Sequence, residues 1–161
     1  KDKSVKYDIL KDSLSKIDLT DVKLAIQTMP PFPWHFGGQS FHNLFVDPDE
    51  INEFCSATGL SVCLDISHSM MACNYYGWNL NEFSSKISKH VNYLHIVDAI
   101  GSDGEGVQIG NGDVDFEELG KILGEKCKDI PFIPEIWQGH KNEGSAFWEA
   151  LNFLEPYFQT K

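Results

Sequence analysis

The sequence contains no arginine. All 13 of its basic residues are lysines, and 24 acidic residues give a formal net charge of −11. Nucleic-acid binding requires clustered cations that neutralise phosphates, and these lysines form no cluster in the sequence. Arginine is also the usual bidentate partner of phosphate, although lysines or helix N-termini can serve. We therefore expect no nucleic-acid or anionic-membrane partner, and a heavily phosphorylated substrate is disfavoured.

Long apolar runs and closely spaced cysteine pairs are also absent. No stretch approaches the roughly 18 consecutive apolar residues of a membrane span, and no hydrophobic block near the start indicates a secretory signal. The four cysteines lack the Cys-x-x-Cys spacing of a zinc site, and Cys55, Cys63 and Cys127 fall at apolar positions. We expect reduced structural thiols, which are typical of a cytoplasmic protein.

The 161 residues, 42% hydrophobic and 23% charged, are typical of one folded domain. Four short apolar runs of strand length recur along the chain, and each precedes a turn-rich loop and a helical pattern. These runs are Lys23–Gln27, Leu60–Ile66, Val91–Val97 and Pro131–Ile136. This alternation predicts an α/β domain over residues 1–161 with a parallel sheet covered by helices.

The predicted helices have clear start signals. Asp47 before Pro48 is typical of an N-cap followed by a first-turn proline, and Gly59 can end that helix. Asn79 and Asp115 are each followed three residues later by a glutamate, as in a capping box. Two further helices are expected, one beginning at Ser145 and one over Asp8–Leu19.

One polar side chain stands at or near the end of each predicted strand. Gln27, Asp65, His95 and Glu135 are separated by 38, 30 and 40 residues, which is about one strand–helix unit each. In a parallel α/β barrel the carboxyl ends of the strands share one face, where the active site lies. We favour a site formed by these four residues over the alternative that each merely ends a strand.

Four units are only half of an eight-unit barrel, which typically needs about 250 residues. An open half-sheet would leave a bare strand edge, which natural proteins avoid. We therefore expect this chain to supply the last four β/α units of a barrel. We expect the missing half-barrel to belong to the same longer chain. The alternative is that the partner in a homodimer supplies it.

Two carboxylates and an imidazole among the strand-end residues suit a divalent metal. Asp65, His95 and Glu135 offer ligands that fit Mn, Co, Zn, Fe or Mg. Such a metal polarises a carbonyl and eases removal of the adjacent C–H proton, and a carboxylate beside it, here Glu135, would act as base. His68, just beyond a strand end, is a second catalytic candidate that could bind or stabilise a substrate oxygen; the alternative is a histidine hydrogen-bonded within its loop.

Four segments together resemble the xylose isomerase-like TIM-barrel superfamily, over roughly residues 22–156 and its last four strands. The segments are Leu64–His68, Leu94–Ala99, Gly104–Phe116 and Ile133–Ile136. This group includes sugar isomerases and epimerases, inosose dehydratases and the endonuclease IV branch (AP endonuclease family 2). Residues Pro33–Gln39 with His42–Phe45 resemble a subgroup associated with biosynthesis of nonulosonate sugars.

The resemblance implies a metal bound by a glutamate, an aspartate, a histidine and a glutamate on successive strands. The last three match Asp65, His95 and Glu135, but Gln27 stands in place of the first glutamate. An amide oxygen can ligate a metal weakly, yet glutamine cannot accept a proton as a base. Either Glu135 works alone, or the chemistry differs, or the activity is lost.

Softer candidates for substrate binding lie in the loops. Within the glycine-rich segment Gly101–Asp113, which we expect to be a loop at the barrel mouth, Gln108 and Asp113 are placed to meet hydroxyls. Trp34 and Trp137 offer flat apolar faces to a sugar ring, and His35 lies in a long loop that could close over a ligand. Aromatic residues near loops are, however, more often packing anchors.

Three functions follow from these features. The first is a metal-dependent sugar isomerase or epimerase, or a dehydratase, that acts on an uncharged or acidic sugar. The second is a non-catalytic or regulatory sugar-binding domain that keeps the pocket without the base. The third, a phosphodiesterase or DNA-repair activity, fits the fold but conflicts with the negative charge and with the small number of metal ligands.

Overall fold

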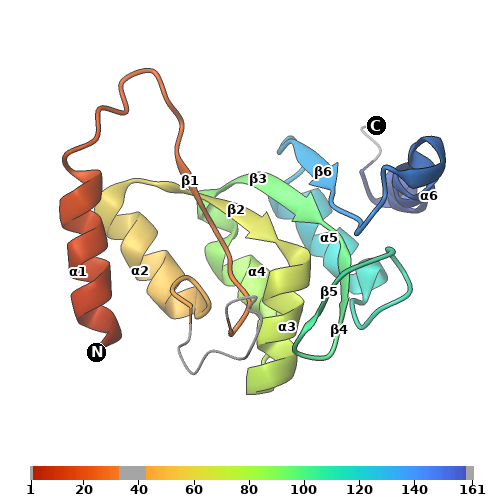
Figure 1. Cartoon of the computed structure of the whole chain (residues 1–161), viewed down its shortest axis with the longest axis horizontal. Coiled ribbons are helices and arrows are strands. Elements are labelled where there is room, and N and C mark those ends of the chain that lie inside the picture. The colour runs from red at the N-terminus through yellow and green to blue at the C-terminus, as the bar shows by residue number, and fades with distance from the viewer. Residues whose placement is uncertain (1, 33–42, 159–161) are drawn as a thin grey trace.

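A four-stranded parallel sheet forms the centre of the computed structural model, which describes residues 2–32 and 43–158. The strand order is β1–β2–β3–β6, so successive units add along the sheet as in a barrel wall (Figure 1). The strands are Ala25–Gln27 (β1), Ser61–Asp65 (β2), Val91–Ile96 (β3) and Phe132–Pro134 (β6). The predicted α/β class is confirmed, and the arrangement is that of a partial TIM barrel.

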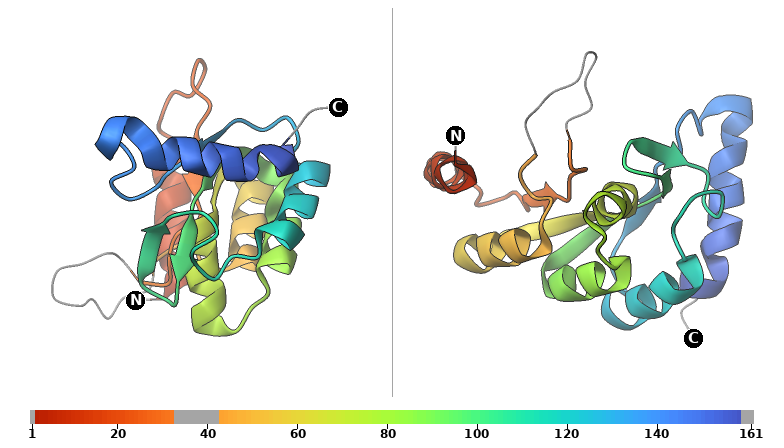
Figure 2. Two further views of the ribbon diagram at one scale, coloured as in Figure 1. Left: turned by 90° about the vertical axis from the view of Figure 1, so that its right-hand side faces the viewer. Right: turned by 90° about the horizontal axis from the view of Figure 1, so that it is seen from below.

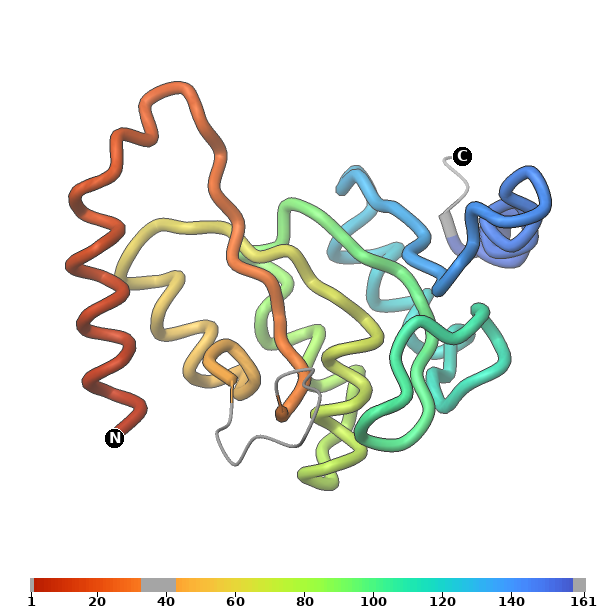
Figure 3. The backbone as a smooth tube through the Cα atoms, in the orientation of Figure 1, coloured from red at the N-terminus to blue at the C-terminus, as the bar shows by residue number. Residues whose placement is uncertain are grey.

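The helices follow one another in an arc along the sheet, except that α3, which continues from the end of β2, lies off this arc (Figure 2). They are Lys3–Leu14 (α1), Pro48–Thr58 (α2), Ile66–Tyr76 (α3), Leu80–Ile87 (α4), Phe116–Lys126 (α5) and Lys141–Phe158 (α6), with a 3-10 turn at Ser88–His90. The two ends of the described chain lie at opposite ends of the molecule, as the backbone trace shows (Figure 3). Within residues 2–32 and 43–158, no helix combines the length and apolar character of a membrane-spanning segment.

The two faces of the sheet differ in burial because side chains alternate along a strand. Leu64 and Leu94 point toward the helices and are completely buried in the apolar core. On the opposite face, Tyr93 is half-buried and Ile133 is exposed. The helices therefore cover one face, and the other face corresponds to the inside of a barrel wall.

Short polar side chains fix the helix starts at the predicted places. Asp47 accepts a hydrogen bond from the Asp49 amide at 2.8 Å, and Asn79 and Asp115 cap α4 and α5 in the same way. Gly59 ends α2 in the left-handed conformation, with a φ of 73°, that glycine adopts at low cost. In α6 the backbone is left-handed over residues 142–144, so regular helix begins near Ser145.

Three local predictions were wrong. The first helix spans Lys3–Leu14 instead of Asp8–Leu19, because Asp2 caps it by accepting from the Ser4 amide. A turn-rich loop was expected after the second strand, but the helix α3 follows β2 directly, since Asp65 ends the strand and also caps the helix. The glycine-rich segment is not only a loop: Asp98–Ile100 (β4) and Gly104–Val107 (β5) pair as an antiparallel hairpin.

Candidate metal site and cavity

Side chains from the ends of neighbouring strands meet on the open face of the sheet. Asp65 and His95 are direct partners in the β2–β3 register, and Glu135 follows the end of β6. His95 Nδ1 lies 2.7 Å from Glu135 Oε2 and 3.4 Å from Asp65 Oδ2. One donor atom from each of the three residues lies within 4.8 Å of the others. The structure thus brings together the three predicted metal ligands that carry a carboxylate or an imidazole.

Asp65 is the most firmly held member of this cluster and is only 1% exposed. Its Oδ1 accepts from the His68 amide at 2.9 Å as the N-cap of α3. Its own backbone amide donates to Thr28 Oγ1, also at 2.9 Å. Because the cap and the strand fix its rotamer, Asp65 Oδ2 faces the cluster in a preset position.

The amide of Gln27 lies among these groups. Its Nε2 donates to Asp65 Oδ2 at 2.9 Å and lies 3.5 Å from His95 Nδ1 and 3.4 Å from His68 Nδ1. In this orientation Gln27 presents its NH₂ group to the cluster, whereas an amide ligates a cation through its oxygen. As a ligand Gln27 would have to turn its amide over so that Oε1 faces inward.

The hydrogen bond to Asp65 is the main reason that the pKa of His95 is raised, to about 10. The neighbouring Cys63 thiol and the charge of Glu135 raise it further, while burial opposes the shift. The cluster therefore favours a positive charge at the imidazole edge. A divalent cation would supply such a charge, and an imidazole with two carboxylates is a donor set that metals of intermediate hardness accept. The residues present fit a divalent metal.

His68 stands beside the cluster, in the first turn of α3. Its Nδ1 lies 3.0 Å from the Thr28 carbonyl oxygen, and its Nε2 lies 3.3 Å from Glu105 Oε2. Burial lowers the pKa of His68, but the hydrogen bond to Glu105 and the charge of Asp65 outweigh it, so the net shift is upward. Glu105 comes from β5, within the glycine-rich segment that was expected at the barrel mouth.

A cavity of about 220 Å³ opens next to these groups. Trp137, with 64% of its surface exposed, is the predicted aromatic residue found in its wall. Eight residues line the cavity: Asp65, Ser67, His68, Val97, Glu105, Gly106, Glu135 and Trp137. The predicted catalytic pair, Glu135 and His68, therefore faces the same space as the predicted ligand Asp65.

Other predicted contacts lie elsewhere. Gln108 donates to the Ala146 carbonyl oxygen at 3.2 Å, and Asp113 accepts from the Gly101 amide at 2.7 Å, so both hold the hairpin and its flanking loop instead of lining the cavity. Trp34 and His35 fall outside the described residues.

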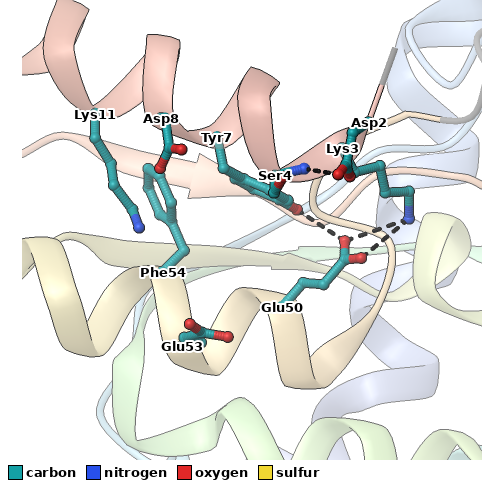
Figure 4. A pocket seen from close by; sticks show the side chains of 9 residues that line it. All are labelled: Asp2, Lys3, Ser4, Tyr7, Asp8, Lys11, Glu50, Glu53 and Phe54. Atoms are coloured by element: carbon teal, nitrogen blue, oxygen red, sulfur yellow. Dashed lines mark hydrogen bonds and ion pairs between the residues drawn. The ribbon is translucent and has the colours of Figure 1, made fainter.

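A separate cavity of about 340 Å³ lies between α1 and α2 (Figure 4). Tyr7 donates to Glu50 Oε2 at 3.1 Å and accepts from the Phe45 amide at 2.9 Å, while Lys3 pairs with Glu50 at 3.2 Å. These contacts dock α1 onto α2. They bring together no cluster of metal-ligating residues among those described, so we assign this cavity a structural role.

Comparisons with known proteins agree with this geometry. The sequence profile of a family described as xylose isomerase-like TIM barrel matches residues 2–157. No sequence among curated proteins matches the chain.

Similar solved structures include a D-tagatose 3-epimerase-like protein, which is 21% identical with a TM-score of 0.69. A 3-keto-D-glucoside 4-epimerase from E. coli is 14% identical with a TM-score of 0.67, and endonuclease IV from Thermus thermophilus is 20% identical with a TM-score of 0.58. The matches cover 94%, 97% and 93% of this chain, but only 54%, 56% and 58% of those structures. At these identities the likeness shows the fold, and the chain spans about half the length of the structures that it matches.

Proposed function

We propose that this chain, which belongs to the xylose isomerase-like TIM-barrel family, carries the metal-binding half of a sugar isomerase or epimerase. The observation that carries the proposal is the cluster of Asp65, His95 and Glu135, whose donor atoms lie within 4.8 Å of one another. The cluster opens onto a cavity of about 220 Å³ at the carboxyl ends of the strands, where barrels of this class hold their active sites.

Asp65, His95 and Glu135 would hold a divalent metal, with Gln27 as a weaker fourth ligand through its amide oxygen. Mn, Co, Zn and Mg are all compatible with this mixed donor set. When bound, such a metal supplies Lewis acidity that polarises a sugar carbonyl and the neighbouring hydroxyl.

Glu135 is the base in this proposal, because its side chain is 53% exposed at the cavity and a carboxylate accepts a proton directly. It would remove the proton from the hydroxyl-bearing carbon next to the carbonyl and deliver it to the carbonyl carbon, while the hydroxyl proton passes to the carbonyl oxygen. His68 would bind a substrate hydroxyl through Nε2, in exchange for its long 3.3 Å contact with Glu105. Asp65, held by the His68 amide at the N-cap of α3, would keep Oδ2 facing the cluster.

Gln27 bears on which reaction is catalysed. Inversion at a carbon atom needs one group to remove a proton from one face and another to deliver a proton to the opposite face. Since Gln27 cannot carry a proton, Glu135 working alone favours isomerisation or dehydration over inversion. Glutamine at position 27 also favours the alternative function, a non-catalytic sugar-binding domain, if Glu135 by itself is insufficient for catalysis.

We also propose that the other four β/α units belong to the same longer chain or to a second copy. The described sheet ends at β1 and β6, and its open face carries the exposed Ile133. Sheets avoid such free edges. All four cysteines are free and buried, which agrees with a reducing compartment such as the cytoplasm.

Proton exchange tests the proposed reaction. Candidate ketoses and aldoses are incubated in D₂O with protein loaded with diamagnetic Zn²⁺, and loss of the C–H signal next to the carbonyl is followed by NMR. Glu135→Gln should abolish the exchange, while Glu125→Gln, an exposed site on α5, should leave it unchanged. Sugar binding without exchange in the wild-type protein would overturn the enzyme proposal and support the sugar-binding alternative.

A further inference from the structure

Glu105 reaches the cavity from outside the parallel sheet. It lies on β5, and its side chain is 29% exposed beside His68. The hairpin that carries it is tied to the site at a second point, because the Trp137 amide donates to the Gly106 carbonyl oxygen at 2.9 Å. Trp137 follows Glu135 by two residues, so Glu105 and Glu135 are held in a fixed relation across the cavity.

Asp98 fixes the other end of this hairpin from a completely buried position. Its Oδ1 accepts from the amides of Ala99 and Val114 at 2.8 and 3.0 Å. Its Oδ2 accepts from the amides of Gly110 and Gly112 at 3.0 and 2.8 Å. Four backbone bonds to one carboxylate make the turn after β5 rigid, so Glu105 is presented by a preorganised element.

The charges around the cavity are one-sided. Asp65, Glu105 and Glu135 supply three carboxylates, and none of the eight lining residues in the described chain is a lysine. A divalent cation on Asp65, His95 and Glu135 would offset two carboxylates and leave that of Glu105. The one helix N-terminus at the cavity is that of α3, where the carboxylate of Asp65 already occupies the cap. Against these three carboxylates, the described part of the cavity offers a phosphate only the imidazole of His68.

The His68–Glu105 pair distinguishes ligands by their hydrogen bonding. A sugar hydroxyl both donates and accepts, so it can donate to Glu105 Oε2 and accept from His68 Nε2 at the same time. An ionised phosphate only accepts, and it would meet Glu105 as a like charge. Two like charges a few ångströms apart at a partly exposed site oppose binding by more than about tenfold.

We propose that Glu105 is a specificity-determining residue that selects unphosphorylated, uncharged sugars and rejects sugar phosphates. This inference rests on the proposed function, since it concerns the substrate of the same metal-binding site. It assigns Glu105 a direct contact with a substrate hydroxyl, with His68 as the second partner of that hydroxyl.

Two sugars that differ only in a phosphate test the inference. Mn²⁺ uptake by the full chain is first measured by electron paramagnetic resonance after desalting. The ¹H relaxation rates of D-fructose and D-fructose 6-phosphate are then measured during titration with the loaded protein, because bound Mn²⁺ accelerates the relaxation of nearby nuclei only. We expect the wild-type protein to bind D-fructose at least about tenfold more tightly than its phosphate.

Variants of the hairpin complete the experiment. Glu105→Lys should reverse the preference, and Glu105→Gln, which keeps a polar side chain without its charge, should reduce it. Asp103→Lys makes the same charge change on the exposed turn of the hairpin and should leave the preference as in the wild type. Any of three results would overturn the inference. The wild type binds D-fructose 6-phosphate as tightly as D-fructose or more tightly, Glu105→Lys keeps the wild-type preference, or the loaded protein leaves the relaxation rates of both sugars unchanged. Absence of Mn²⁺ uptake would instead overturn the proposed function on which it rests.

Discussion

Replacing Asp98 by asparagine should destabilise the protein strongly, although the two side chains have nearly the same shape. The carboxylate is completely buried and accepts from four backbone amides, two at each oxygen. Asparagine keeps one oxygen and turns an NH₂ group toward the other two amides. Two bonds to a charged group, each worth about 1.5–3 kcal/mol, are lost, and the part-buried amides of Gly110 and Gly112 face the NH₂ group, which is also a donor. We expect the free energy of unfolding to fall by about 3 kcal/mol or more.

Urea unfolding followed by circular dichroism measures this loss, and amide hydrogen exchange locates it. The amides of Gly110 and Gly112 should exchange on the order of 100-fold faster in Asp98→Asn, since about 3 kcal/mol corresponds to that factor. Asp115→Asn is a suitable control, because asparagine also serves as an N-cap and the exposed site should change by less than about 0.5 kcal/mol. A loss below about 1 kcal/mol in Asp98→Asn would refute the assigned role of the carboxylate.

Two further predictions concern packing and the thiols. Gly112→Ala should lower stability by about 1–3 kcal/mol, because the added methyl would collide with the Ala99 carbonyl oxygen and the Asp98 carboxylate. Gly124→Ala lies in α5, where the added methyl would meet only the Tyr157 carbonyl oxygen at 3.6 Å, so this change should raise stability by up to about 1 kcal/mol. Equal effects of the two glycine substitutions in urea unfolding would contradict this packing. Burial raises the pKa of Cys73 to about 12 and that of Cys55 to about 11, so at pH 8 these two thiols should react slowly with a disulfide reagent until urea is added. A fast reaction of the native protein would show that the thiols are accessible.

Much of the sheet and the convergence of the site could be predicted because both follow from short-range patterns. Each strand is an apolar run, and the regular spacing of Gln27, Asp65, His95 and Glu135 places one polar residue at each strand end. Parallel strands carry their carboxyl ends to one edge, so the meeting of Asp65, His95 and Glu135 needed no knowledge of side-chain rotamers.

Features that depend on longer-range or dual-purpose contacts escaped prediction. Glu105 joins the cavity through the β4–β5 pairing and the contact of Gly106 with Trp137, neither of which leaves a periodic signal in the sequence. The helix α3 was missed because Asp65 ends a strand and caps a helix at once. Gln108 and Asp113 looked like ligand contacts because they are polar residues in a loop, yet the structure uses them to hold backbone groups.

Metal content tests directly whether Asp65, His95 and Glu135 bind a divalent cation. The purified chain is incubated with Mn²⁺, desalted and analysed by inductively coupled plasma mass spectrometry, beside His95→Ala and the control His90→Ala. His90 contacts Asn52 at 3.2 Å and takes no part in the cluster. We expect nearly one Mn²⁺ per chain in the wild type and in His90→Ala, with uptake lost in His95→Ala. No uptake by the wild type, or equal uptake by His95→Ala, would contradict it.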